Sequence, residues 1–205
     1  MTLEPLPDSV PDDELLVRIA AGNGSAFTTL FRRRQPDVYR VALLMTGLPA
    51  AAEDVTQEVF LVVMRDAARY EAGRSSVTAW LCGIARNHAR RRLEREGRIV
   101  PLHEEREAEM PGIAVYPDPI GDLANREQRN ALRQAVLNLP LRYREVVVLC
   151  DLQELSYADA AAALDCAVGT VRSRLHRARA LLAAKMRARL APRETPAKKI
   201  TRCLA

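Results

Sequence analysis

Arginine and hydrogen-bonding side chains crowd one short stretch near the C-terminal end of this 205-residue chain. In residues 172–179 they are Arg172, Ser173, Arg174, His176, Arg177 and Arg179. A guanidinium group can donate paired hydrogen bonds to a phosphate or to the O6 and N7 atoms of guanine. These side chains are therefore suited to binding an anionic partner that accepts hydrogen bonds.

The spacing of the apolar residues around this stretch predicts the helix that presents it. They recur at intervals of three and four as Val168, Val171, Leu175, Ala178 and Leu182, which makes one apolar stripe. Ser173, His176 and Arg177 then face away from the stripe, and the other arginines flank it. A short helix over 158–164 and a turn at 165–169 precede it, so we predict a helix-turn-helix whose second helix lies in a DNA major groove. The alternative is an ordinary solvated basic face.

Composition indicates an all-α protein with an anionic partner. Aromatic residues make up only 4% of the chain, Leu, Ala, Val and Arg dominate, and the formal net charge is +5. No apolar run approaches the roughly 18–20 residues that span a bilayer. The N-terminus is acidic and Pro-rich, unlike a signal peptide. We therefore expect a cytoplasmic protein without a membrane span.

Helix-breaking residues and the periodicity of apolar residues divide the chain into two small helical domains. We expect a first domain at 12–96 with helices over 13–21, 26–47, 50–70 and 77–96. Asp12 or Asp13 is expected to cap the first of these helices, and Ser25 the second. In the third helix Val55, Val59 and Met64 are expected to face inward with Val62 and Val63.

The remainder of the chain is predicted to form a linker, a second domain and a tail. Proline and acidic residues without apolar periodicity indicate a flexible linker at 97–125. The second domain, 126–190, has helices at 128–139 and 141–151 before the helix-turn-helix, and 191–205 is a basic tail. Four scattered cysteines and three scattered histidines give no metal-site spacing, so we expect no cofactor and no metal. Cys203, in the tail, is the one thiol expected to be accessible.

Three segments resemble, in order, those of the extracytoplasmic-function (ECF) RNA polymerase sigma factors. AEDVTQEVFLVV is similar to the family's polymerase-binding helix, and TAWLCGIARNHARRRL to its promoter-melting helix. LPLRYREVVVLCDLQELSYADAAAALDCAVGTVRSRLHRAR is similar to its C-terminal DNA-binding unit. The resemblance covers about 12–95 and 127–186, and three segments in order are far more specific than one helix-turn-helix.

The resemblance implies site residues for three tasks. Polymerase binding is implied for Asp54, Gln57, Glu58 and an exposed Phe60. Recognition of the −10 element is implied for Arg74, Ser75, Ser76, Arg86, Asn87 and Arg90, around a loop that captures a flipped base in the family. Recognition of the −35 element is implied for Thr170, Arg172, Ser173, Arg174, His176, Arg177 and Arg179. Asp165 stands where the family usually has Gly, and Ala167 offers no side-chain cap.

The function implied is promoter-specific transcription initiation with core RNA polymerase and promoter DNA as partners, and an anti-sigma factor as a further partner. The alternative is a stand-alone helix-turn-helix regulator that binds operator DNA without polymerase. Because the sequence has no Gly-rich phosphate loop and no catalytic constellation at recognisable spacing, we do not expect an enzyme.

Overall fold

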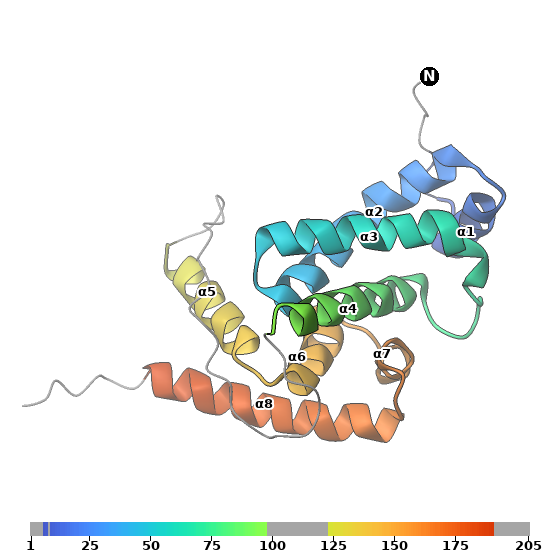
Figure 1. Ribbon diagram of the computed structural model, residues 1–205. Helices are drawn as coiled ribbons and strands as arrows, with labels where there is room; N and C mark the ends of the chain where they lie inside the picture. The colour runs from blue at the N-terminus through green and yellow to red at the C-terminus, as the bar shows by residue number, and fades with distance from the viewer. Residues whose placement is uncertain (1–5, 8, 98–122, 191–205) are drawn as a thin grey trace, which may run out of the picture.

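A computed structural model describes residues 6–7, 9–97 and 123–190 (Figure 1). Within those ranges every regular element is a helix, so the predicted all-α class is confirmed. Most of the predicted linker, 98–122, and the predicted basic tail, 191–205 with Cys203, lie outside the described residues.

The N-terminal part of the fold is a bundle in which three long helices lie side by side (Figure 1). Its elements are α1 (Asp12–Ala20), α2 (Gly24–Thr46), α3 (Pro49–Asp66), a short 3-10 turn (Ala67–Arg69) and α4 (Val77–Arg95). Their apolar stripes meet in the interior, and Leu16, Leu30 and Leu81 are almost fully buried there. Pro36 lies inside α2 without ending it.

The predicted capping residues of the first two helices differ from those in the structure. Asn23, not Ser25, caps α2, because its side-chain oxygen accepts a hydrogen bond from Ala26 N at 2.9 Å. Asp12 caps no helix and instead pairs with Arg33 and Arg34 of α2, which ties α1 to the bundle. A carboxylate this deeply buried needs such partners, and two guanidinium groups supply them.

The C-terminal part contains the predicted helix-turn-helix. It consists of α5 (Leu123–Leu137), α6 (Leu141–Val147), a π-helical turn η2 (Val148–Leu152), α7 (Tyr157–Leu164) and α8 (Val168–Leu190). Asp165 ends α7 in the left-handed conformation, with φ of 51° and ψ of 54°. Asp tolerates this region better than most residues do, so the turn forms without the glycine usual in the family.

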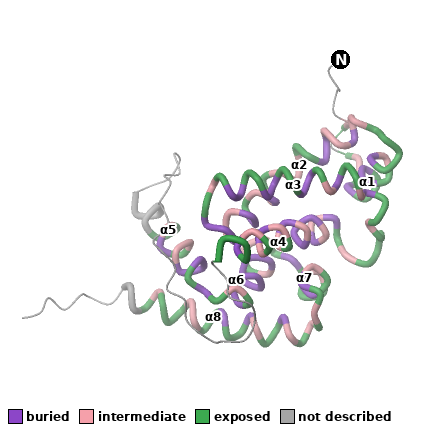
Figure 2. Tube along the Cα trace, viewed as in Figure 1, coloured by how far each residue is buried: buried purple, intermediate pink, exposed green. Residues whose placement is uncertain are grey.

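The two parts pack against each other and share one cluster of buried side chains. Figure 2 shows that both parts contain buried positions along their helices. Figure 1 shows α6 and α7 between α4 and α8, in agreement with the contacts of α7 with both α4 and α8. The sequence predicted two domains but no contact between them. That contact governs which candidate site residues are accessible.

Candidate polymerase and DNA interfaces

One side of α3 carries exposed polar residues followed by exposed apolar ones. Asp54, Gln57 and Glu58 are exposed, as their helical spacing allows. Leu61 and Met64 continue the same side, with 56% and 60% of their surface exposed. These five residues form what we call the α3 face. The expectation that Met64 faces inward is wrong, because the buried stripe of α3 is formed by Val55, Val59 and Val63.

Phe60 is not the exposed aromatic that was expected. Only 3% of its surface is exposed, and its ring lies 4.7 Å from that of Phe31 and 6.2 Å from that of Phe27. These edge-on contacts make an aromatic cluster between α2 and α3. The signal was present in the sequence, since Phe60 lies beside Val59 and three residues before Val63 in the apolar pattern of this helix.

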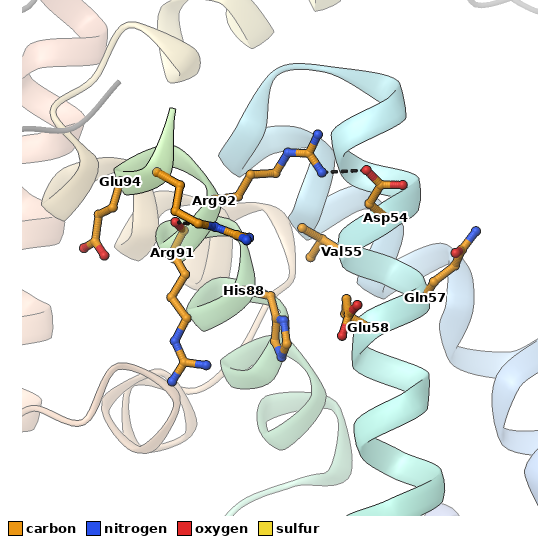
Figure 3. A pocket seen from close by; sticks show the side chains of 9 residues that line it. Asp54, Val55, Gln57, Glu58, His88, Arg91, Arg92 and Glu94 are labelled. Carbon is orange, nitrogen blue, oxygen red and sulfur yellow. Dashed lines mark hydrogen bonds and ion pairs between the residues drawn. The ribbon is translucent and has the colours of Figure 1, made fainter. Parts of the chain in front are cut away.

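A polar groove of about 860 Å³ separates the α3 face from the second half of α4 (Figure 3). Asp54 accepts a hydrogen bond from Arg92 Nη1 at 2.6 Å across it. His88 lies across the groove from Glu58, and burial lowers the pKa of His88, so the imidazole is neutral at pH 7. Because Val55 is the only apolar residue in the lining, the groove suits a charged macromolecular surface better than an apolar small molecule.

The loop before α4 is held in place by Tyr70. Its hydroxyl donates to Asp13 Oδ1 at 2.7 Å and lies 2.9 Å from the Ser75 carbonyl oxygen, and its ring packs on Trp80. Ser76 caps α4 by accepting from Ala79 N at 3.2 Å. Arg74, by contrast, is exposed and pairs with Glu71 at 3.3 Å.

The polar residues implied for −10 recognition on α4 differ in accessibility. Asn87 is exposed, and Arg90 pairs with Glu94 one turn away at 2.7 Å. Arg86 donates through Nε to Glu145 of α6 at 2.6 Å and through Nη1 to Asn87 at 2.9 Å. Arg86 is therefore engaged by the second domain.

The helix α8 presents the predicted face. Val171, Leu175 and Ala178 are buried, while the expected base readers on the opposite side are exposed, namely Arg172, Ser173, His176 and Arg177. Thr170 and Arg174 are partly exposed beside them. The predicted stripe and the direction of the polar face are confirmed.

Two of these arginines have partners on neighbouring elements. Arg179 makes a bidentate pair with Asp151, at 2.6 and 3.1 Å, and this hydrogen-bonded pair raises the pKa of Arg179. Arg177 hydrogen-bonds the Tyr143 hydroxyl and lowers the pKa of that phenol. Both contacts hold the guanidinium groups in place relative to α6 and η2.

Of the residues implied for −10 recognition, the structure brings Ser76 and Arg86 into contact with the second domain, and it leaves the α3 face and the α8 face open. Sequence reasoning missed Glu145 and Asp159, which contact Arg86 and Ser76. Asp151, Glu154 and Asp165 lie in the same domain, so acidic character alone did not single these two residues out. No group of three or more metal-ligating side chains occurs among the described residues.

Thiol reactivity gives a first test of the packing. Burial raises the pKa of Cys82 to about 12 and that of Cys150 to about 11. At pH 8 only about one Cys82 side chain in ten thousand is a thiolate, so iodoacetamide is expected to leave it unmodified in native protein. Peptide mass spectrometry with and without guanidinium checks this; rapid native labelling would show that the α4 core opens readily.

Comparison with known proteins gives two family matches in order along the chain. Residues 30–99 match sigma-70 region 2, and residues 129–182 match sigma-70 region 4. The chain is 37% identical over 177 residues to the ECF RNA polymerase sigma factor SigM of Mycobacterium tuberculosis, covering 84% of this chain and 83% of that protein. It is 32% identical to the ECF RNA polymerase sigma-E factor of Escherichia coli, covering 85% and 93%.

Solved structures agree with the sequence matches. CnrH in complex with the cytosolic domain of CnrY is similar with a TM-score of 0.65 and 26% identity, covering 86% of this chain and 97% of that one. The sigma factor RpoE of Bartonella quintana, in complex with the anti-sigma factor NepR, is similar with a TM-score of 0.65 and 27% identity, covering 78% and 96%. In the part of this chain that is described, no helix is long and apolar enough to cross a membrane.

Proposed function

The chain belongs to the ECF group of sigma-70 RNA polymerase sigma factors, and on that premise we propose how its surfaces divide the work of initiation. As a member of this family the protein binds core RNA polymerase and directs promoter-specific transcription initiation. The stand-alone regulator is not favoured, because both sigma regions are present in order. The observation that carries the proposal is the pair of open faces, acidic on α3 and basic on α8.

We assign polymerase docking to Asp54, Gln57 and Glu58, with Leu61 and Met64 as apolar neighbours. Carboxylates on an exposed helix can accept charge-assisted hydrogen bonds from a basic partner helix. Exposed apolar side chains beside them supply buried anchors in the complex. We do not assign direct contact to Phe60 in this conformation, since its ring lies in the core.

We assign −35 recognition to the exposed face of α8 and −10 recognition to the loop 71–76 with α4. We propose that base edges are met by the exposed residues Arg172, Ser173, His176 and Arg177, and phosphates by Thr170, Arg174 and Arg179. On the −10 side the corresponding residues are Arg74, Ser75, Ser76, Arg86, Asn87 and Arg90. The proposed boundaries are 12–96 for the first domain and 126–190 for the second.

The decisive experiment is size-exclusion chromatography of the purified chain with sigma-free core polymerase. Co-elution at one-to-one stoichiometry, displaced by excess of another sigma factor, is the expected result. A chain that does not co-elute and instead shifts duplex DNA alone would overturn the assignment and support a stand-alone regulator.

Replacing Arg177 by alanine is expected to weaken −35 recognition by about tenfold or more, because one good bidentate base contact contributes roughly 1–3 kcal/mol of discrimination. Polymerase binding should not change. Transcription in vitro, from promoters selected out of a random library by the wild-type holoenzyme, measures the effect. Arg187→Ala, an exposed charge further along α8, is the matched control; equal losses in both variants would mean that general charge, not base contact, is responsible.

Membership of this family also supports proposals about the partners of the chain, its lack of enzymatic activity and its location in the cell. Sigma factors are non-enzymatic regulatory subunits, and we propose that this chain likewise catalyses no reaction and acts in the cytoplasm with polymerase. We further propose an anti-sigma partner, as for the similar RpoE bound to NepR. Affinity purification from native cells should recover a stoichiometric inhibitor; recovery of polymerase alone would contradict this.

A further inference from the structure

Two tyrosines from the helices before α8 contact the arginines that we assign to base reading. Both α6 and α7 pack on α8 (Figure 1). Tyr143 of α6 is only 8% exposed, and its hydroxyl oxygen accepts a hydrogen bond from Arg177. Tyr157 is the first residue of α7, and Arg172 Cζ lies over its ring, 5.8 Å from the ring centroid. Each of the two arginines therefore has an aromatic neighbour from outside its own helix.

Tyr143 is packed tightly enough to hold its partner in place. It belongs to the cluster of buried side chains that also contains Leu175 and Ala178 of α8. In addition, Arg142 Cζ lies over its ring, 4.8 Å from the centroid, which is within the range of a cation–π contact. A ring packed in this way has little freedom to move. Its hydroxyl oxygen is therefore a fixed acceptor for the guanidinium group of Arg177.

Tyr157 contacts two different arginines through its ring and its hydroxyl group. The ring lies under Arg172, and the hydroxyl group hydrogen-bonds Arg179, which is paired in turn with Asp151. Ser156 caps α7 directly before Tyr157, which fixes the start of this helix. The tyrosine itself is 38% exposed, so Arg172 rests on it at the protein surface and stays accessible.

We propose that Tyr143 and Tyr157 are positioning residues for −35 recognition, which hold Arg177 and Arg172 in the orientation that reads base edges. A free arginine side chain has many rotamers, and ordering it on DNA costs conformational entropy that a side chain already held in place largely avoids. A guanidinium group has more N–H donors than a bidentate base contact uses, so a hydroxyl oxygen or a ring face can hold it without blocking that contact. The inference rests on the proposed −35 role of α8.

Removing the Tyr143 hydroxyl group alone tests the first of these contacts. Binding of each variant holoenzyme is compared on a promoter selected by the wild-type holoenzyme and on copies with each −35 base pair changed in turn. The ratio of the two affinities is the discrimination at that base pair, and Arg177→Ala identifies the base pair that Arg177 reads. Tyr143→Phe is expected to lower discrimination there about fivefold, the effect of losing one hydrogen bond, and nowhere else.

The double variant shows whether the hydroxyl group acts through Arg177. In the Arg177→Ala background, Tyr143→Phe should cause no further loss of discrimination, because the hydroxyl group then has no guanidinium group to hold. Tyr39→Phe, at a half-buried tyrosine of α2, is the matched control for loss of a phenol hydroxyl group and should leave discrimination unchanged at every base pair. Thermal melting checks that every variant is folded.

Tyr157 should respond differently to substitution, because its ring and not its hydroxyl group contacts Arg172. Tyr157→Phe keeps the ring and should keep discrimination at the base pair that Arg172→Ala identifies. Tyr157→Leu removes the ring and should lower that discrimination about threefold. Equal losses in the two variants would overturn the ring contact as the positioning interaction.

The other failures are also distinguishable. Unchanged discrimination in Tyr143→Phe, or losses from Tyr143→Phe and Arg177→Ala that multiply in the double variant, overturns the positioning role of Tyr143. A loss of binding that is equal on every promoter copy overturns it too, because it shows a structural role only. If Arg177→Ala and Arg172→Ala leave discrimination unchanged at every −35 base pair, the proposed reading face of α8 is wrong instead.

Discussion

Replacing Asp54 and Glu58 together by alanine is expected to lower the affinity for core RNA polymerase by at least about a hundredfold. Each carboxylate can accept charge-assisted hydrogen bonds that are buried in the complex, and losing such bonds at the centre of an interface has large effects. The proposed −35 face lies on α8 and should still bind DNA. Fluorescence anisotropy of labelled protein titrated with core polymerase gives the affinity.

The control for this variant must remove the same charge elsewhere on the domain. Glu14 and Glu71 are exposed and pair only locally, with Arg18 and Arg74. Glu14→Ala with Glu71→Ala should therefore bind polymerase as wild type does. Equal losses in both double variants would show that overall charge, and not the α3 face, governs docking.

The local structure of the second domain could be predicted because its apolar pattern leaves little choice. Val171, Leu175 and Ala178 lie on one stripe of α8, and their burial fixes the direction of every polar side chain on that helix. Ser156 accepts a hydrogen bond from Asp159 N at 3.0 Å and so begins α7 one residue before the predicted start. Periodicity and capping are local properties, which sequence reasoning handles well.

Residues at the margin of an apolar stripe were harder to place. Val62, Val63 and Met64 follow one another, and at 100° per residue they cannot all face the same interior. The structure buries Val63, half-buries Val62 and exposes Met64. Which of them is buried depends on where α2 and α4 lie, and a single helix pattern does not contain that information.

Contacts between the domains could not be predicted at all. Arg86 and Glu145 are separated by 59 positions, and Ser76 and Asp159 by 83. No periodicity relates such residues. DNA binding alone was enough to explain each arginine of α4, so the sequence did not indicate that any of them has a partner within the protein. The most informative feature of the site therefore comes from tertiary packing.

Phe60→Ala is expected to destabilise the first domain by about 3–5 kcal/mol, the usual cost of removing a large buried aromatic side chain. Its ring is 3% exposed and closes the cluster with Phe27 and Phe31, so truncation leaves a cavity between α2 and α3. Thermal or urea unfolding followed by circular dichroism measures the loss. Leu61→Ala, at the exposed neighbour, should stay within about 0.5 kcal/mol of wild type.

Measuring polymerase binding by variants at Phe60 and Leu61 distinguishes a residue that packs in the core from one that docks on polymerase. Phe60→Leu keeps most of the buried apolar volume, so the protein should remain folded and bind polymerase with nearly wild-type affinity. Leu61→Ala should do the opposite, because it removes an exposed apolar group from the α3 face without opening a cavity. If Phe60→Leu is stable yet fails to bind polymerase, the ring must leave the core on docking, and Phe60 then belongs to the interface after all.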